Sequence, residues 1–452
     1  MSSDLGTIVA LATPPGRGAV AIVRVSGPGA RSVAERVFRS RTALRERVAT
    51  TGTILDAAGE TLDRGLALWM PAPRSYTGED VLELHVHGSP VVVRETLRAA
   101  LAAGARLATQ GEFTRRAFLA GKLDLSAAEA VADLIEAEGR SAVRSAAARL
   151  AGGLVEIVAA LRARLQTMLE ELAGSLDFPD EVPEPERAPF AARLHAIADE
   201  LQRLFGSWET GRLVREGTTV AIVGPPNAGK SSLLNALLGE ERALVSEISG
   251  TTRDTIEESL AIDGVFVRLV DTAGIREHAD RLEAAGIERA RRALEQARIA
   301  LVVIDASQPL GAEARAILVA TRERERVLFF NKRDLGRTGY DAREAAERDA
   351  LLGSTRDSTD LAHVRELIAH RGWGGVLPDL ERPHLASARQ ADCVSAAVRA
   401  LERACETIER GDPLDFTSSD LIEASAALGG ITGEDATEEL LDGIFARFCI
   451  GK

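Results

Sequence analysis

The segment 224–231, Gly-Pro-Pro-Asn-Ala-Gly-Lys-Ser, has the spacing GxxxxGK[ST] of a phosphate-binding loop. It follows the apolar run 220–223 and precedes a helical pattern over 231–238, which is the context that the motif requires. In such a loop the backbone amides and the helix N-terminus cradle phosphate oxygens. Lys230 would then reach the β and γ phosphates, and Ser231 would bind Mg²⁺.

Two further motifs follow apolar runs and indicate a guanine nucleotide. The segment 271–274 reads Asp-Thr-Ala-Gly, in which the acid would support Mg²⁺ and the glycine amide would contact the γ-phosphate. The segment 331–334 reads Asn-Lys-Arg-Asp, and Asp334 can accept hydrogen bonds from ring donors that guanine has and adenine lacks. Between them, Ser-Gly-Thr-Thr-Arg-Asp (249–254) suits a switch loop that orders on the γ-phosphate, or a plain turn. The motifs together predict a GTP hydrolase.

One residue expected of such an enzyme is missing. Ras-type enzymes place a water-orienting glutamine just after the DxxG motif, and this chain has Ile275 there. Another residue must therefore orient the attacking water, and no arginine finger is evident.

Lysine is rare in this chain. Of 55 basic residues only four are lysine, which leaves 55 − 4 = 51 arginines. A position that stays lysine is a candidate for needing a compact ammonium rather than a planar guanidinium. Lys230 and Lys332 fall in the nucleotide motifs, so Lys122 and Lys452 are functional candidates as well.

The composition is that of an ordinary globular protein. The 452 residues suggest about two to four domains. Three unpaired cysteines favour a reducing compartment, and neither a signal peptide nor a membrane-length apolar run is present, so a cytoplasmic protein is expected. The net charge of −13 argues against a broad basic surface for RNA, which leaves local patches such as Arg115–Arg116, or plain solvated helix faces.

The elements that must position these residues follow from hydrophobic periodicity. Residues 1 to 120 alternate strands with short helices, and Glu83 lies in an alternating strand over 81–86. Helical spacing runs from 125 to 176 and from 187 to 214, with a proline-rich break between them. Residues 215–375 alternate strand and helix, as in a parallel doubly wound sheet, and the chain is helical again from 384. We therefore expect an α/β domain inserted into a helical one.

The chain resembles the MnmE (TrmE) family of tRNA-modification GTPases over nearly its whole length. The matching segments are ATPPGRG (12–18), TGEDVLEL (77–84), GEFTRRAF (111–118), KLDLSAAEAVADLI (122–135), DFPDE (177–181), PNAGKSSLLNALL (226–238), SGTTRD (249–254), DTAGIRE (271–277) and the terminal FCIGK (448–452).

The resemblance implies a multidomain fold of α+β and α/β parts. An N-terminal α+β folate-binding and dimerisation domain would span 1–121. An all-α domain would comprise 122–214 and 379–452, with a Ras-like, doubly wound P-loop GTPase domain inserted at 215–378.

It also implies a function. The homodimer would work with the FAD-dependent partner MnmG as a heterotetramer, and would add an aminomethyl or carboxymethylaminomethyl group to C5 of the tRNA wobble uridine. The one-carbon unit would come from a 5-formyl- or 5,10-methylene-tetrahydrofolate, and GTP would be hydrolysed with Mg²⁺ and K⁺, the K⁺ replacing an arginine finger.

Site residues carry over from the family by motif. The water-orienting acid would be Glu283, an ordinary surface acid by sequence alone. Mg²⁺ would be bound by Ser231 and Thr252. K⁺ would be bound by Asn227, Ser246, Thr251 and the carbonyl of Ile248. The GTP set adds Ala228, Gly229, Lys230, Ser232, Glu247, Ser249, Gly250, Asp271, Thr272, Ala273, Gly274, Asn331, Lys332, Asp334, Ser354, Thr355 and Arg356.

The folate site would comprise Arg24, Glu83, Lys122 and Lys452, although an exposed strand acid is the plainer interpretation of Glu83. Cys449 would take part in the modification chemistry, or else be a buried structural cysteine on an amphipathic final helix whose apolar face includes Leu440.

The sequence departs from the family pattern in places. Ser354-Thr355-Arg356 replaces a usual SAK or SAR, Ser89 replaces the second glycine of HGG, and Ser246 replaces a common threonine. Two other functions stay open: a ribosome- or RNA-assembly GTPase switch, and a scaffold that only positions the FAD partner.

Overall fold

The computed structural model describes residues 6–239, 257–262, 265–271, 294–295, 297–336, 350–372 and 383–452. The chain divides into two compact units. The first contains residues 1–135, 149–190 and 399–452, and the second contains 136–148 and 191–398. This division is coarser than the four predicted segments, whose bounds stay a prediction. Among the described helices, none is long and apolar enough to cross a membrane.

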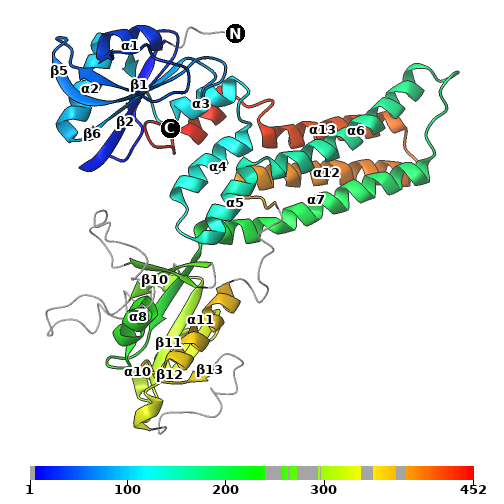
Figure 1. Cartoon of the computed structure of the whole chain (residues 1–452). Coiled ribbons are helices and arrows are strands. Elements are labelled where there is room, and N and C mark those ends of the chain that lie inside the picture. Colours follow the sequence, from blue (N-terminus) through cyan, green and yellow to red (C-terminus); the bar gives the residue numbers. More distant parts are fainter. Residues whose placement is uncertain are drawn as a thin grey trace. The chain divides into compact units, whose positions relative to one another are not determined.

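The first unit contains a seven-stranded sheet in the order β3-β4-β5-β6-β2-β1-β7 (Figure 1). All neighbours pair antiparallel except β1 and β7. The strands are β1 (Ile8–Leu11), β2 (Gly18–Ser26), β3 (Phe38–Arg39), β4 (Thr50–Leu55), β5 (Thr61–Met70), β6 (Val81–Gly88) and β7 (Arg106–Leu107).

Helices cover one face of this sheet. Alternate residues of β2 and β6, among them Val23, Val25, Leu82 and Leu84, form a buried core with α1 (Ala30–Val37) and α2 (Pro90–Ala102). The intervening residues of the same strands point to the opposite face, because successive side chains of a strand alternate. That opposite face carries Arg24 and Glu83, as the alternating pattern predicts.

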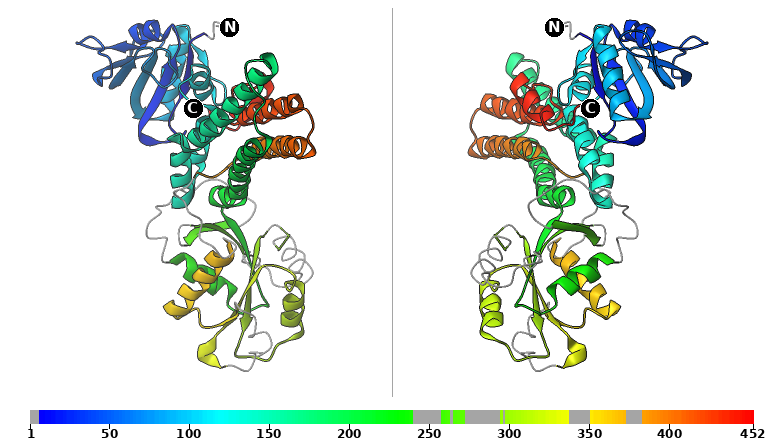
Figure 2. Two further views of the ribbon diagram at one scale, coloured as in Figure 1. Left: turned by 90° about the vertical axis from the view of Figure 1, so that its right-hand side faces the viewer. Right: turned by 90° about the vertical axis from the view of Figure 1, so that its left-hand side faces the viewer.

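The same unit also contains helices. The two long helices α6 (Gly153–Asp177) and α13 (Leu414–Thr432) pack side by side (Figures 1 and 2), with leucines at helical spacing along α6 buried between them. Arg162 on α6 forms an ion pair with Glu434 just beyond α13. The remaining helices here are α3 (Glu112–Leu119), α4 (Leu125–Glu136) and α14 (Glu438–Phe445).

The second unit contains a six-stranded sheet in the order β13-β12-β11-β8-β10-β9. Five strands are parallel: β8 (Thr218–Val223), β10 (Val265–Asp271), β11 (Ile299–Asp305), β12 (Arg326–Asn331) and β13 (Ala350–Leu352). The edge strand β9 (Glu257–Ile262), which was not among the predicted strands, pairs antiparallel with β10.

Both faces of this sheet are covered, as in a doubly wound fold. One core packs the sheet against α8 (Lys230–Gly239) and α11 (Ser358–Gly372), and the other packs it against α10 (Ala312–Ala320). The helices α5 (Arg140–Leu150), α7 (Arg187–Glu216) and α12 (Ala388–Arg410) each have residues in both units. A short 3-10 helix, η1, spans Arg333–Leu335.

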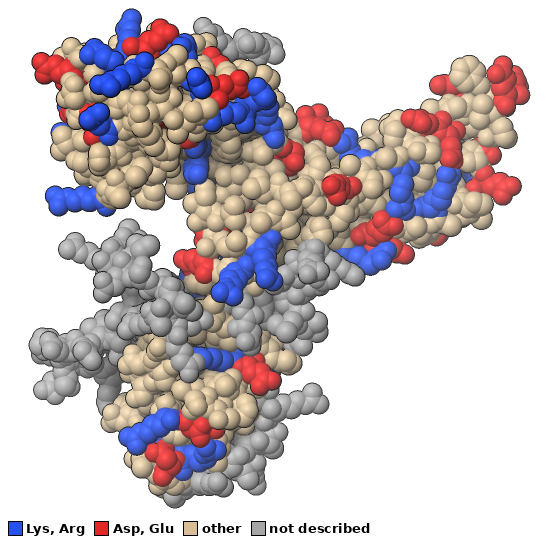
Figure 3. Space-filling view, viewed as in Figure 1, with Lys and Arg blue, Asp and Glu red and all other residues tan. Residues whose placement is uncertain are grey.

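Charged side chains are interspersed on the face drawn in Figure 3, where Lys and Arg alternate with Asp and Glu. Arg115 and Arg116, for which a local basic patch and a solvated helix face were the two open alternatives, are both paired with acids. Arg116 is 3% exposed and pairs with Glu79 and Glu112, while Arg115 pairs with Asp442. These two arginines therefore hold the fold together and do not form an open cationic surface.

Candidate functional site

The predicted nucleotide motifs lie at one edge of the second unit's sheet. The loop 224–229 follows β8, the segment 332–334 follows β12, and Ser354 lies two residues beyond β13. The carboxyl ends of parallel strands share an edge, and ligands of open α/β sheets bind there. Asp271 is the last residue of β10 and pairs in register with Ile222 of β8, which places its backbone at the same edge.

The phosphate-binding loop has no room for larger residues at two glycines. A Cβ on Gly224 would collide with the carbonyl oxygen of Val303, and one on Gly229 would collide with the amide of Asn331. Gly229 also has a φ of +100°, and Asn227 has a φ of +60°. The loop therefore turns tightly enough to aim its amides at one point, as an anion-binding loop requires.

The ammonium group of Lys230 lies within this loop. Its Nζ donates to the carbonyl oxygens of Gly224 at 2.7 Å and Pro225 at 2.8 Å. Ser231 and Ser232 are exposed at the start of α8. A cation and a hydroxyl at the N-terminus of a helix fit a phosphate group and its Mg²⁺.

Asn331 joins three of the segments. Its side chain is 1% exposed, its Nδ2 donates to the carbonyl of Ala228 at 2.9 Å, and its Oδ1 accepts from the amide of Thr355 at 3.1 Å. A single buried amide thus fixes the phosphate loop against β12 and the segment after β13.

Lys332 connects the phosphate loop to β11. Its Nζ donates to the carbonyl of Asn227 and to Oδ2 of Asp305, both at 2.7 Å. Burial alone would raise the pKa of Asp305, but hydrogen bonds from Lys332 and Ser307 hold that pKa below its ordinary value. Asp305 stays ionised and fixes the lysine, a role that sequence reasoning missed although the acid stands at a strand end.

Asp334 lies among polar groups of the segment after β13. Its Oδ1 accepts from the hydroxyl of Ser354 at 2.9 Å, and its Oδ2 is 3.6 Å from a guanidinium nitrogen of Arg356. The amide of Ser354 donates to the buried Asp360 at 2.8 Å. The Ser-Thr-Arg segment thus contacts Asp334 directly, despite its departure from the family pattern.

Several predicted residues lie outside the described residues, and their roles stay predictions. They are Ser246, Glu247, Ile248, Ser249, Gly250, Thr251, Thr252, Thr272, Ala273, Gly274 and Glu283. In the part of the chain that the structure describes, no group of three or more His, Cys, Asp or Glu side chains could hold a metal ion.

A second candidate site lies on the open face of the first unit's sheet. Arg24 on β2 stands opposite Glu83 on β6, and its Nε donates to Oε1 of Glu83 at 2.8 Å. The Arg24 guanidinium carbon lies 5.7 Å from the ring centroids of both Tyr76 and Phe113. These contacts fix the guanidinium in one orientation. No motif or spacing in the sequence indicated the two aromatic residues.

The C-terminal segment reaches this site within the same chain. Ile450 pairs with Gln110 in an antiparallel bridge, and the amide of Phe113 donates to the carbonyl of Lys452 at 3.2 Å. The carbonyl of Gly451 lies 3.4 Å from a guanidinium nitrogen of Arg24. Three of the four predicted folate residues thus gather around one ion pair.

Lys122 and Cys449 are both exposed. The stem of Lys122 lies close to Gly78 in the TGED segment. Cys449 lies beyond the end of α14, so the alternative of a buried cysteine on that helix is wrong, and Leu440 is 37% exposed rather than part of the packed face. Leu441, Phe445 and Phe448 form the buried side.

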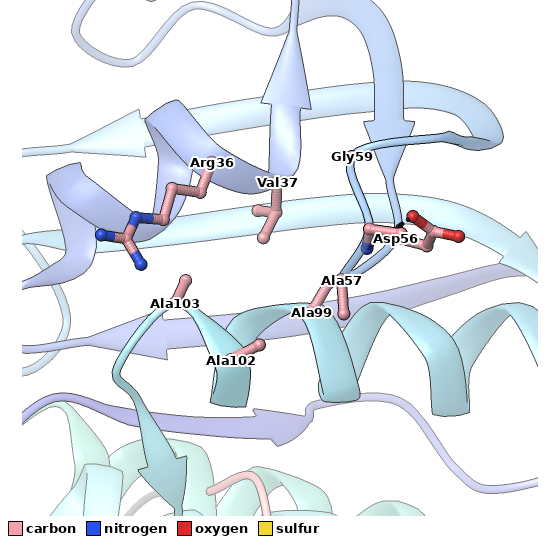
Figure 4. A pocket seen from close by; sticks show the side chains of 9 residues that line it. Arg36, Val37, Asp56, Ala57, Gly59, Ala99, Ala102 and Ala103 are labelled. Carbon is pink, nitrogen blue, oxygen red and sulfur yellow. Dashed lines mark hydrogen bonds between the residues drawn. The ribbon is translucent and has the colours of Figure 1, made fainter.

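A pocket of about 280 Å³ lies elsewhere in this unit, between the ends of α1 and α2 and the β4–β5 turn (Figure 4). Five of its nine lining residues are alanines. Its one carboxylate, Asp56, accepts from the amides of Ala58 and Glu60 at 2.9 Å. That carboxylate is committed to the turn, so the pocket offers no acid–base pair for catalysis.

Comparisons with known proteins agree with these observations. The family model described as the N-terminus of the GTP-binding protein TrmE matches residues 7–122, and the one described as the MnmE helical domain matches residues 125–449. Proteins named tRNA modification GTPase MnmE match over 99% of this chain and 99% of their own length. Those of Heliobacterium modesticaldum and Chloroflexus aurantiacus are 43% identical to it, and that of Symbiobacterium thermophilum is 44% identical.

Proposed function

This chain belongs to the MnmE family of tRNA modification GTPases, and from that premise we propose that it hydrolyses GTP to drive the modification of a tRNA wobble uridine. The observation that supports the nucleotide assignment best is the buried Asn331. It holds the phosphate loop beside Asp334 and Ser354, so a phosphate site and a guanine-reading site lie at one sheet edge.

Each described side chain has a separate task in this proposal. When GTP binds, Lys230 leaves its two backbone carbonyls and donates to the β and γ phosphates instead. Hydrogen bonds from a cation to charged phosphate oxygens are stronger than those to neutral carbonyls. Asp334 accepts from the guanine ring, while Ser354 and Arg356 orient its carboxylate. Lys332 stays fixed by Asp305 and holds the loop at Asn227.

The metal ions are assigned by residue type. Ser231 and Thr252 would hold Mg²⁺, and Asn227, Ser246, Thr251 and the carbonyl of Ile248 would hold K⁺. When bound, the two cations neutralise charge that develops on the transferred phosphoryl group. Glu283 would orient the attacking water in place of the missing glutamine.

The one-carbon chemistry is proposed for the site around Arg24 and Glu83. A tetrahydrofolate derivative would bind there and would also be contacted by Lys122 and Lys452. Cys449 would take part in the modification reaction. The protein would work as a homodimer with the FAD-dependent partner MnmG and would add an aminomethyl or carboxymethylaminomethyl group to C5 of the uridine. The placement of Lys452 beside Phe113 supports this grouping.

The decisive experiment is mass spectrometry of tRNA nucleosides from a strain that lacks this chain. We expect the modified wobble uridine to disappear, to return with the wild-type chain, and to stay absent with Lys230→Ala, which removes the phosphate-binding cation. Lys122→Arg should also fail to restore the modified uridine, although the variant protein should still hydrolyse GTP in vitro. Unchanged nucleosides together with a ribosome-assembly defect would instead favour the assembly switch.

A further inference from the structure

The open face of β6 presents a row of polar side chains. Glu83, His85 and His87 alternate with Leu82, Leu84 and Val86, which face the core. Glu83 uses its Oε1 oxygen to accept from Arg24 at 2.8 Å. His87 is directed elsewhere, because its Nδ1 lies 2.8 Å from Oδ1 of Asp63 on β5.

One polar atom in the middle of this row is buried without a hydrogen-bond partner. Nε2 of His85 lies 3.5 Å from Oε2 of Glu83. It makes no hydrogen bond within the part of the chain that the structure describes. Leaving a buried polar atom unsatisfied is unfavourable, so His85 and the neighbouring carboxylate of Glu83 form a pair that is poised for a ligand.

Apart from Arg24, the cross-strand neighbours of this pair are apolar. Ile22 on β2 and Leu66 on β5 stand opposite His85, and Leu68 stands opposite Glu83. Cross-strand neighbours share a face, and all three side chains are half-buried there. Hydrogen bonds made against such a surface are strengthened, because little water competes for them.

We propose that Oε2 of Glu83 and Nε2 of His85 together bind a lactam edge, an N–H beside a C=O, of a pterin-type heterocycle. The inference rests on the proposed folate function and makes His85 a specificity-determining residue of that site. The carboxylate accepts from the ring N–H. The carboxylate oxygen beside Nε2 favours the tautomer with its hydrogen on Nε2, which donates to the ring C=O.

This arrangement discriminates between rings that differ at one group. A ring with an amino group in place of the oxo group presents a donor to His85, which is itself a donor. The two donors repel, and the ring nitrogen beside the amino group no longer carries the hydrogen that the carboxylate of Glu83 accepts, so both hydrogen bonds to the lactam edge are lost. A site built to hydrogen-bond one group rejects analogues that leave it unpaired.

The test uses the full-length protein and two ligands that differ only at that group, folic acid and aminopterin, with affinities measured by isothermal titration calorimetry. The wild type should bind folic acid about a hundredfold more tightly, about tenfold for each of the two hydrogen bonds. His85→Leu should reduce this preference by about tenfold and leave the part that Glu83 supplies. His85→Gln, whose amide can donate or accept, should keep the affinity for folic acid and gain affinity for aminopterin.

His87→Leu is the matched control, because His87 lies on the same strand, is 71% exposed at its side chain and faces Asp63. It should leave both affinities unchanged. A preference that His85→Leu leaves unchanged would overturn the inference, as would a wild type that binds both ligands equally. If the wild type binds neither folic acid nor 5-formyltetrahydrofolate, the proposed folate function itself fails.

Discussion

The carboxylate of Asp334, which is proposed to recognise the guanine base, is held by neighbouring polar groups. Its two oxygens face the Ser354 hydroxyl and the Arg356 guanidinium, both from the segment after β13. These contacts keep the group oriented, so guanine donors would meet a preorganised acceptor. Preorganisation lowers the ordering cost of binding.

We predict that Asp334→Asn changes the preferred nucleotide from GTP to XTP. The variant amide can donate to the ring oxygen that xanthine carries where guanine carries an amino group. Turnover with each nucleotide at low concentration should show a reversal of at least about tenfold, the value of one exchanged hydrogen bond. Asp357→Asn, which alters an acid paired with Arg333 nearby, is the control. A variant that still prefers GTP would remove Asp334 from base recognition.

Gly451 is the residue on which the docking of the C-terminal segment depends. Its φ is +100°, and a Cβ there would collide with the carbonyl of Leu11. We predict that Gly451→Ala displaces this segment and weakens binding of 5-formyltetrahydrofolate by about tenfold or more, because strain of this kind costs about 1–3 kcal/mol. Calorimetry would measure this. Gly443→Ala, with open space around its Cβ, should bind normally, and equal affinities of the two variants would contradict the prediction.

At the scale of elements, α3 is anchored at its first residue. Glu112 accepts from Arg106, from the amide of Thr109 and from Arg116. Burial alone would raise the pKa of Glu112, but these three donors lower it from 4.5 to about 2. The folded-state pKa is depressed, so the stabilisation is complete above about pH 4.5 and is lost as the pH falls through about 2.

We predict that Glu112→Gln destabilises α3 by about 3 kcal/mol at neutral pH, the equivalent of the pKa difference. Hydrogen exchange of the α3 amides, compared with wild type at each pH, would measure it. The difference between the two proteins should shrink as the pH falls below about 4.5 and nearly vanish near 2. A pH-independent difference would show that packing, not the carboxylate, is responsible.

Sequence patterns predicted the elements whose residues carry their own signal. Short apolar runs predicted the core strands β8, β10, β11 and β12. The glycine-rich loop was predicted from its GxxxxGK[ST] motif. The antiparallel strand β9 was missed, because its Glu-Glu-Ser-Leu-Ala-Ile sequence has no strong strand periodicity and its pairing with β10 is a tertiary effect. Tyr76, Phe113 and His85 could not be assigned either, because their contacts come from strands and helices distant in sequence.

At the scale of the whole molecule, the two candidate sites belong to different compact units, each with its own hydrophobic core. Substitutions in one site can therefore be assessed against the activity of the other. Of the proposed K⁺ ligands, only Asn227 is among the described residues. The K⁺ prediction is therefore tested by the activity of the nucleotide site.

We predict that GTP turnover by the intact protein is at least about tenfold faster in K⁺ than in Na⁺, because the proposed K⁺ would replace an arginine finger, whose contribution is larger still. Glu283→Ala should keep GTP affinity and lose hydrolysis in both salts. Steady-state phosphate release and nucleotide binding would measure these effects. Equal rates in the two salts would exclude the K⁺ assignment, and normal turnover of the variant would exclude Glu283.

The pairing of Gly451 with Arg24 joins residues 427 positions apart. Protein synthesis proceeds from the N-terminus, so β2 and β6 emerge from the ribosome long before the segment that contacts Arg24. The sheet can form early, but the contacts around Arg24 are completed only once the helical and nucleotide-binding segments have been made. A chain interrupted between β7 and Gly451 would therefore carry every strand of the N-terminal sheet but an unfinished site. Translation itself would ensure that only molecules with the nucleotide-binding unit acquire it.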